Sequence, residues 1–377
     1  MIPAAFRGGQ NMFSFLVSFA ASALLTLLVI KQAHLHLPAL DRDFSGIRKV
    51  HLHRVARIGG LPIYIALLTS AIATALTHPA ITAWLMALLL SGLCALVGGI
   101  VEDYTGRFGV WRRLLLTMVA ALAAFLLLDA RIERIDFPSG TVMLPLIWIS
   151  LPLTVLAVSG IAQAINIIDG LNGLASVVTI CMLVSLVYVG WQVGDVFVLS
   201  AALMVAGATT GFLIWNYPIG LIFLGDGGAY FLGFMLGELA LLLVMRNPEV
   251  STWYAALLLI YPAFETVFSA YRRMFLRGKS PVLPDGIHLH TLIFRRIVLW
   301  AAGPIEARAL ARRNSLTSPY LWMLSLMAVI PATVFWKNTP ALIFFCLLFV
   351  VSYLWLYMRI VRFKSPRWLI LRKKDWH

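Results

Sequence analysis

The chain has 377 residues, of which 61% are hydrophobic and only 12% are charged. Soluble domains average about 45–50% apolar and about 25% charged residues, so this composition excludes an ordinary soluble enzyme. It predicts an all-α integral membrane protein that crosses the bilayer many times. The net charge of +14 would suggest nucleic-acid binding in a soluble domain, but in a membrane protein it marks cytoplasmic loops. We therefore expect no nucleic-acid partner.

Eleven apolar runs are candidates for membrane-spanning helices, which need about 20 residues each. They cover approximately 13–30, 61–77, 80–101, 114–128, 146–165, 171–189, 197–214, 229–245, 252–270, 319–336 and 341–358. Eleven crossings place the two termini on opposite sides of the membrane. One set of loops holds 25 of the 30 Lys and Arg residues and the other set holds five. The positive-inside rule therefore predicts an outside N-terminus and a cytoplasmic C-terminus.

These spans predict one polytopic membrane domain over residues 1–358, followed by a basic cytoplasmic tail over 359–377. The tail carries Trp368 and Trp376 and is expected to lie on the inner leaflet, where anionic lipids attract Lys and Arg. Five cytoplasmic loops are expected to form the functional face: 31–60, 102–113, 166–170, 215–228 and 271–318. On the opposite side, alternating residues around a Pro-Ser-Gly turn in 129–145 predict a small hairpin.

Acidic and amide residues gather where the apolar spans meet the predicted cytoplasmic side. Glu102 and Asp103 are adjacent at the end of a span, and neighbouring carboxylates repel each other unless a cation or a proton relieves them. Asn166 and Asp169 share one face of a helical turn. Asp226 stands between glycines just before a span. Each could simply cap or solvate a helix end, but carboxylates beside glycines also suit a Mg²⁺ that holds substrate phosphates.

Two alternating histidines, His288 and His290, follow the basic segment that contains Arg272, Arg277 and Lys279. On an extended segment both imidazoles would face the same side. Zinc binding would require further ligands at suitable spacing, and none is obvious. We interpret the histidines and the neighbouring basic residues as an anion-binding group, suited to phosphate.

Over residues 50–295, motifs in this order resemble the polyprenyl-phosphate N-acetylhexosamine-1-phosphate transferases, which belong to glycosyltransferase family 4. The motifs are Arg57-Ile58-Gly59-Gly60, Glu102-Asp103-Tyr104, Asn166-Ile167-Ile168-Asp169-Gly170-Leu171-Asn172-Gly173-Leu174, Ile222-Phe223-Leu224-Gly225-Asp226, and Pro284-Asp285-Gly286-Ile287-His288-Leu289-His290 preceded by Glu265 and Arg272. The eleven spans and the outside N-terminus also agree with this family.

The resemblance implies an enzyme of the bacterial inner membrane with its active site on the cytoplasmic side. It would transfer a sugar 1-phosphate from a UDP-N-acetylhexosamine to undecaprenyl phosphate, release UMP, and start an envelope polysaccharide of the O-antigen, capsule or teichoic-acid type. Mg²⁺, or alternatively Mn²⁺, would be the cofactor. Further expected partners are membrane lipids and a second copy of the chain in a homodimer.

The resemblance also assigns roles to residues. Asp226 would be the principal metal ligand. Asp103, Glu102 and Asp169 would be catalytic, through the lipid phosphate or the metal shell. Substrate binding would fall to five residues: Asn166, His288, His290, Arg272 and Arg57.

Five positions depart from the family pattern. Glu102 replaces an aspartate, Gly106 an acidic residue, Gln163 an asparagine, Asn172 an aspartate and Thr291 a histidine. These departures keep a catalytically inactive scaffold paralogue open as an alternative. The second alternative is a secondary transporter for an anionic solute. Transporters place ionisable residues near the bilayer midplane, where Glu238 is the clearest acid of this chain.

Overall fold

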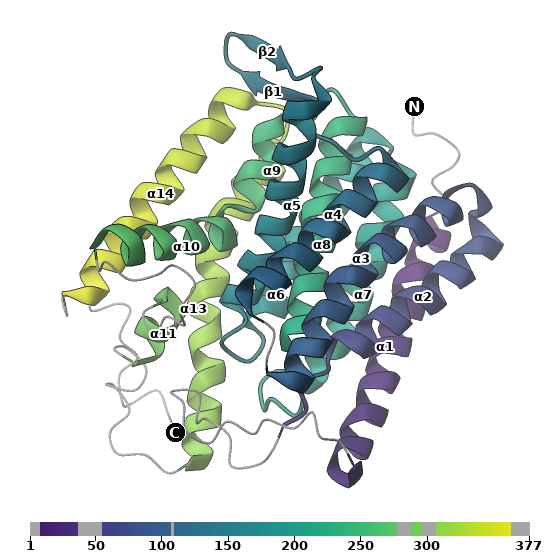
Figure 1. Ribbon diagram of the computed structural model, residues 1–377, viewed down its shortest axis with the longest axis vertical. Coiled ribbons are helices and arrows are strands. Elements are labelled where there is room, and N and C mark those ends of the chain that lie inside the picture. The colour runs from purple at the N-terminus through teal and green to yellow at the C-terminus, as the bar shows by residue number, and fades with distance from the viewer. Residues whose placement is uncertain (1–7, 37–54, 107–108, 277–287, 296–306, 363–377) are drawn as a thin grey trace.

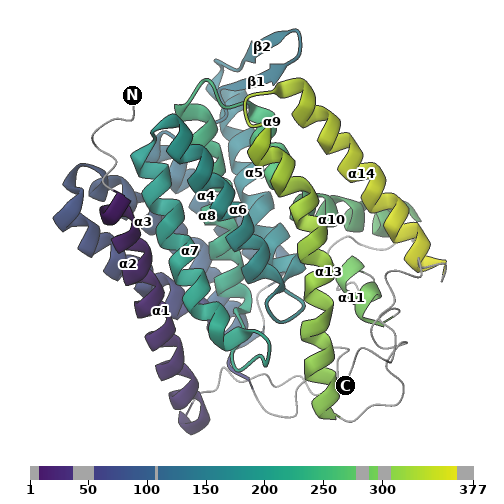
Figure 2. The ribbon, with the colours of Figure 1, turned by 180° about the vertical axis from the view of Figure 1, so that it is seen from behind.

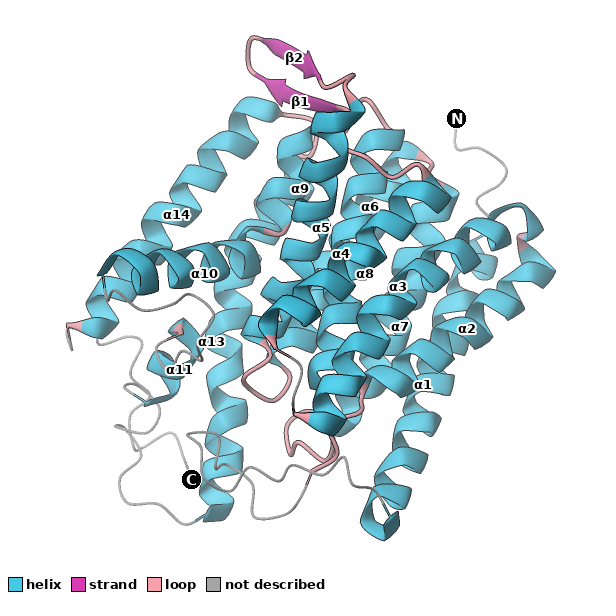
Figure 3. Cartoon of the chain, viewed as in Figure 1, coloured by secondary structure: helices cyan, strands magenta, loops and turns pink. Residues whose placement is uncertain are grey.

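A computed structural model describes residues 8–36, 55–106, 109–276, 288–295 and 307–362. Most helices lie side by side along one direction, and two short strands close one end of the bundle (Figure 1). We call this the hairpin end and the opposite end the loop end, where the turns after α5 and α7 lie (Figure 3). The predicted positions Arg277, Lys279 and Asp285, and residues 363–377 of the predicted tail, lie outside the described residues.

The elements follow one another along the chain with short connections. They are α1 (Gly8–His36), α2 (Gly60–Thr77), α3 (Pro79–Thr105), α4 (Val110–Leu128), β1 (Arg134–Phe137), β2 (Gly140–Met143), α5 (Ile147–Ile168), α6 (Leu174–Val193), α7 (Val196–Asn216), α8 (Gly225–Arg246), α9 (Thr252–Leu258), α10 (Ile260–Tyr271), the π-helical turn η1 (Arg272–Leu276), α11 (Leu289–Ile293), α13 (Ala307–Val334) and α14 (Thr339–Val361).

The all-α polytopic membrane fold is confirmed. Among the described residues, nine helices are long and apolar enough to cross a membrane, or ten if α9 and α10 together form one span, in place of the eleven expected. The run expected as a span over 252–270 is broken at Leu259, because the helical segments Thr252–Leu258 and Ile260–Phe275 meet at an angle of 69°. The run predicted at 61–77 is helix α2, whose apolar part, Gly60–Leu76, falls below the length of a full span.

The predicted hairpin is confirmed, with β1 and β2 antiparallel and Phe137 opposite Gly140. Arg134 fastens it to the bundle, since its Nη2 donates to the carbonyls of Val244 and Val250 at 3.0 and 2.8 Å. Its Nη1 lies 2.8 Å from Asp136 Oδ2. The hairpin is therefore held to α8 and to the α8–α9 connection by hydrogen bonds from Arg134, whose side chain is oriented by an ion pair within β1.

Helix α8 is the centre of the bundle, with 94% of its apolar stretch buried. Small residues let its neighbours approach closely: a Cβ on Gly99 of α3 would overlap the backbone of Gly227 in α8. Glycine is the residue that permits such backbone contact. Because Asp103 lies one turn after Gly99 and Asp226 directly before Gly227, this contact brings the loop-end carboxylates of α3 and α8 together.

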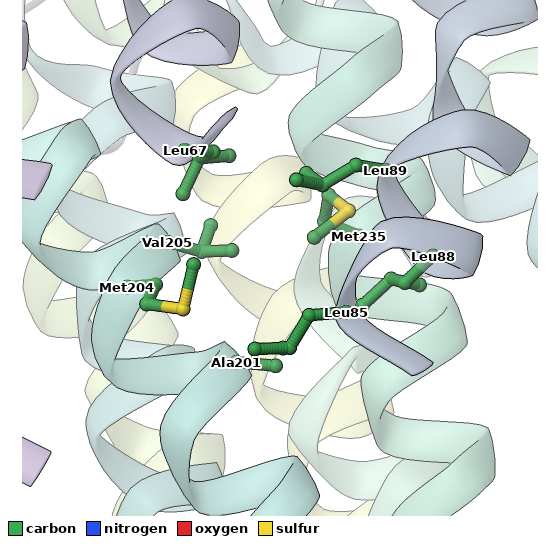
Figure 4. A pocket seen from close by; sticks show the side chains of 8 residues that line it. All are labelled: Leu67, Leu85, Leu88, Leu89, Ala201, Met204, Val205 and Met235. Carbon is green, nitrogen blue, oxygen red and sulfur yellow. The ribbon is translucent and has the colours of Figure 1, made fainter. Parts of the chain in front are cut away.

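A small apolar cavity lies between α2, α3, α7 and α8 (Figure 4). Eight side chains line it: Leu67, Leu85, Leu88, Leu89, Ala201, Met204, Val205 and Met235. Its volume of about 10 Å³ is at the lower limit for one water molecule, and a water would need polar partners. We interpret it as a gap in the packing, so the functional site must lie elsewhere.

Candidate active site

The segment before α2 pairs with the segment before α8. Ala56 and Ile222 form a parallel bridge, and the N–H of Gly59 donates to the carbonyl of Phe223 over 3.0 Å. Gly225 adopts a left-handed φ of +76°, and a Cβ there would overlap the carbonyl of Arg57. A side chain at this position would therefore push the two segments apart. The first and fourth predicted motifs thus form one structural unit at the loop end.

Asp226 lies in the first turn of α8, between two side-chain donors from other helices. Its Oδ1 accepts a hydrogen bond from Asn166 Nδ2 at 3.0 Å. Its Oδ2 lies 3.2 Å from Nη1 of Arg113, at the start of α4. The helix N-terminus adds a favourable field for a carboxylate. Residues from three helices therefore fix the orientation of this carboxylate.

Asp103 lies in the last turn of α3, facing the same point. Its Oδ2 accepts a hydrogen bond from the N–H of Gly227 at 3.1 Å. The carboxylate of Asp226 repels its charge and the guanidinium of Arg57 attracts it. Because the carboxylates of Asp103 and Asp226 repel each other, a cation or a proton bound between them is favoured.

Arg113 connects Glu102, the neighbour of Asp103 in the sequence, to Asp226. Its Nη1 lies 3.7 Å from Glu102 Oε1 as well as 3.2 Å from Asp226. The three side chains are 17–22% exposed, so the cluster is partly buried but reachable from the loop end. The sequence interpretation counted Arg113 only as a loop cation. The feature of the sequence that could have identified Arg113 is its place in the same predicted loop, 102–113, as Glu102 and Asp103.

The Asn166–Asp169 segment ends α5, with Asp169 as its C-cap. The following glycine makes close contact with the histidine motif, because a Cβ on Gly170 would come within 2.5 Å of His290 Nε2. Asn166 contacts Asp226 and Gly170 contacts His290. The third predicted motif therefore lies between the carboxylates and the histidines.

The histidines do not lie on the extended segment that was expected from the sequence. Leu289–Ile293 is the short helix α11, His288 is its N-cap and His290 lies within it. The two imidazole rings are nevertheless stacked, with centroids 5.4 Å apart and planes 5° apart. His288 Nδ1 lies 3.2 Å from Glu265 Oε1, on α10. The ring of His288 is thus oriented by a buried acid, and the predicted pairing of the two histidines is present.

Arg272 lies at the junction of α10 and η1 and is only 5% exposed. Its Nη1 donates to Tyr357 Oη on α14 at 2.5 Å, and its guanidinium lies 5.3 Å from the centre of that ring. Arg272 is therefore anchored to the C-terminal helix. Its predicted contact with donor phosphates stays a prediction.

Comparison with known proteins agrees with this geometry. Residues 85–244 match the family described as glycosyl transferase family 4. The chain is 29% identical to a probable undecaprenyl-phosphate N-acetylglucosaminyl 1-phosphate transferase of Bacillus subtilis, over 74% of this chain and 77% of the relative. It is 28% identical to the undecaprenyl-phosphate alpha-N-acetylglucosaminyl 1-phosphate transferase of Thermotoga maritima, over 77% and 82% respectively. A phospho-N-acetylmuramoyl-pentapeptide-transferase of Clostridium beijerinckii is 36% identical, but over only 26% of this chain and 29% of its own.

The chain is therefore similar to glycosyl transferase family 4 through its central helices. The match runs from within α3 to α8 and includes Glu102, Asp103, the turn after α5 and Asp226. Glu265, the histidines and α14 lie beyond it, so their role depends on the geometry described above.

The structure explains three of the departures from the family pattern. Asn172 is buried, and its Nδ2 donates to the carbonyl of Pro218 at 3.3 Å, which an aspartate could not do. Gln163 donates to Thr117 Oγ1 on α4 at 3.1 Å. Gly106 caps α3 with a left-handed φ of +59°, which glycine adopts without strain. The side chains of Asn172 and Gln163 and the backbone of Gly106 thus support the helices around the site.

The resemblance to this family implies a divalent metal ion as cofactor. Within the described ranges, no group of three His, Cys, Asp or Glu side chains is arranged to hold a metal. Mg²⁺ is commonly bound by one or two carboxylates, with substrate phosphates and water completing its shell. Asp226 accepts one hydrogen bond on each oxygen, and each oxygen has a second acceptor site. Asp226 with Asp103 beside it therefore fits a Mg²⁺ that arrives with a phosphorylated substrate.

Proposed function

We propose that this chain transfers a sugar 1-phosphate, from a UDP-N-acetylhexosamine, to undecaprenyl phosphate. An oxygen of the lipid phosphate bonds to the phosphorus that carries the sugar, and the bond between that phosphorus and the bridging oxygen breaks, so that UMP leaves. The supporting observation is the convergence of Asp103, Asn166 and Asp226 from three helices at one end of an apolar bundle. The names of the relatives agree with this reaction.

The electrostatic problem of this reaction is the approach of two anions. Asp226 and Asp103 would hold a Mg²⁺, which would supply positive charge to offset that of the phosphates and of the leaving UMP. Arg113 offsets part of the negative charge of the acidic cluster, since it pairs with Asp226 and Glu102. Arg57 attracts Asp103, and its buried Nε has no hydrogen-bond partner among the residues that the structure describes. That guanidinium is therefore suited to the phosphate of the lipid.

The other predicted residues divide between the two substrates. Asp103 orients the lipid phosphate or accepts its proton. Asn166 and Asp169 contact the nucleotide or keep the carboxylates in place. The stacked His288 and His290, with Arg272 near them in sequence, bind the phosphates of the UDP-sugar, because imidazolium and guanidinium groups donate strong hydrogen bonds to phosphate.

The loop end would face the cytoplasm of a bacterial inner membrane, because 25 of the 30 Lys and Arg residues fall in the loops assigned to that side. The polyprenyl chain would stay in the hydrocarbon while its phosphate reaches the carboxylates. The UDP-sugar would arrive from water. The product would start a lipid-linked envelope polysaccharide.

The test is UMP release by the purified protein with UDP-GlcNAc, undecaprenyl phosphate and Mg²⁺. We expect turnover that is lost on chelation with EDTA and restored by Mg²⁺ or Mn²⁺. A panel of UDP-N-acetylhexosamines identifies the preferred sugar. Absence of UMP release with every donor would contradict the proposal and favour the scaffold. Uptake of an anionic solute into proteoliposomes without UMP release would favour the transporter.

A further inference from the structure

Two tyrosines of the C-terminal helix α14 contact residues of the histidine region. Tyr353 Oη donates to Glu265 Oε2 at 2.5 Å, and Tyr357 Oη accepts the hydrogen bond from Arg272 at 2.5 Å. They are one helical turn apart, and their rings are nearly parallel, with centroids separated by 6.5 Å. Figure 2 shows α14 beside α10 and α13, away from the central helices that match the family. Neither tyrosine belongs to a motif predicted from the sequence.

Glu265 links Tyr353 to His288. One of its oxygens accepts from Tyr353, and the other lies 3.2 Å from His288 Nδ1 and accepts the N–H of Leu289 at 3.0 Å. The carboxylate side chain is only 1% exposed, so water does not replace a missing donor there. A carboxylate buried away from water is stabilised by the hydrogen bonds that the protein donates to it, so the loss of one donor is costly. Loss of the Tyr353 hydroxyl would therefore change how Glu265 holds the imidazole.

The Tyr353 hydroxyl is itself held in place by aromatic packing. Its ring is fully buried and lies edge-on to Phe264 at 5.1 Å and Phe268 at 5.8 Å, both on α10. Such edge-to-face pairs fix the ring plane. The hydroxyl therefore points at Glu265 from a rigid support, and the same side of α10 carries both the acid and the aromatic residues that contact α14.

We propose that Tyr353 is a positioning residue of the active site, which fixes the orientation of His288 through Glu265. The inference rests on the proposed function, in which His288 binds the phosphates of the UDP-sugar. It gives α14, a helix outside the family match, the task of supporting that histidine. Tyr353 does not touch the substrates. It acts by keeping the imidazole in the orientation in which His288 faces its stacked partner His290.

The test compares Tyr353→Phe with a matched control, Tyr254→Phe. Both changes remove one hydroxyl from a fully buried tyrosine, and Tyr254 Oη bonds to Ser185 Oγ at 3.0 Å, near the hairpin end. We expect Tyr353→Phe to lower kcat/KM for UMP release about tenfold. Tyr254→Phe should stay within about twofold of the wild type. Equal rates for Tyr353→Phe and wild type would overturn the inference.

A second readout separates positioning from general loss of stability. In protein labelled with ¹⁵N-histidine and placed in nanodiscs, the Nδ1 signal of His288 is assigned by its absence from His288→Gln. We expect this signal to shift in Tyr353→Phe and to keep its wild-type position in Tyr254→Phe. An unchanged signal would overturn the inference whatever the rates are.

The double variant Tyr353→Phe/His288→Gln completes the test. If Tyr353 acts through His288, its substitution should cost no further activity once the imidazole is gone. Additive losses would show that the hydroxyl acts otherwise. If wild-type protein releases no UMP, the proposed function fails, while the His288 signal still decides whether Tyr353 positions the ring.

Discussion

The side-chain amide of Asn166 donates to Asp226 Oδ1 across 3.0 Å, although 60 residues separate the two in the chain. The other oxygen of Asp226 is held by Arg113. The amide is neutral, and Arg113 shares its single charge with Glu102, so the carboxylate of Asp226 is oriented without being fully neutralised. This is a suitable state for a group that is to bind a metal ion together with a phosphorylated substrate.

Asp226→Asn should lower UMP release by about 100-fold or more, because an amide binds Mg²⁺ weakly and would turn an N–H₂ toward Asn166 or Arg113. Initial rates at saturating Mg²⁺ measure the effect, and thermal unfolding checks that the fold is intact. Asp129→Asn is the matched control, since that carboxylate is 75% exposed and, within the described part of the chain, forms its ion pair with nearby Arg131 near the hairpin end. Full activity of Asp226→Asn would contradict the metal assignment.

Arg113→Gln should lower kcat/KM by about 10- to 100-fold, because it leaves Glu102 and Asp226 without the charge they share. Arg113→Lys should recover only part of the loss, since an ammonium group lacks the planar fork of a guanidinium. The neighbouring exposed Arg112 supplies the control, and Arg112→Gln should remain near wild type. If both glutamine variants lose activity equally, the effect comes from general loop charge and the specific role of Arg113 is wrong.

Asn172→Asp restores the family residue, yet we expect it to destabilise the protein by about 1–3 kcal/mol. The carboxylate would lose the hydrogen bond to the Pro218 carbonyl and would place a charge at a buried position. The free energy of unfolding in detergent measures this, alongside UMP release per folded molecule, which should not rise. A more active variant of unchanged stability would show that position 172 acts in the chemistry.

The hairpin end should lose stability in acid. Burial alone would raise the pKa of Asp136, but hydrogen bonds from Thr252 and Thr141 and the charge of Arg134 together hold this pKa below its ordinary value. A carboxyl whose folded-state pKa is lowered stabilises the fold above its unfolded pKa of about 3.9. That contribution disappears as the pH falls through the lower folded-state pKa.

Thermal unfolding of wild type and Asp136→Asn between pH 7 and pH 3 checks this expectation. The variant should be less stable by an amount that is constant above about pH 5 and shrinks below about pH 4. A difference that does not change with pH would mean that the charge of Asp136 contributes nothing to the hairpin attachment.

Most of the membrane helices could be predicted from the sequence, because a long apolar run in lipid has few alternatives to a helix. The bend at Leu259 was missed, because apolar residues lie on both sides of the break and Pro262, in the first turn of α10, was not taken as a sign of it. The number of spans differs from the eleven expected because of this bend and because the apolar part of α2 is shorter than a full span. The hairpin was predictable because alternation and a turn signal coincide in one short segment.

The sequence by itself determined that this is a basic, many-helix membrane protein, and it predicted which scarce carboxylates, amides and histidines carry its chemistry. It did so because charge is costly in lipid and is kept only where it is used. Only the tertiary structure decided which of these residues meet. The Asn166–Asp226 contact, the bridging Arg113 and the support of Glu265 by Tyr353 depend on how helices distant in the chain pack. No local pattern encodes such contacts, because they arise from the close approach of backbones at glycines such as Gly99 and Gly227.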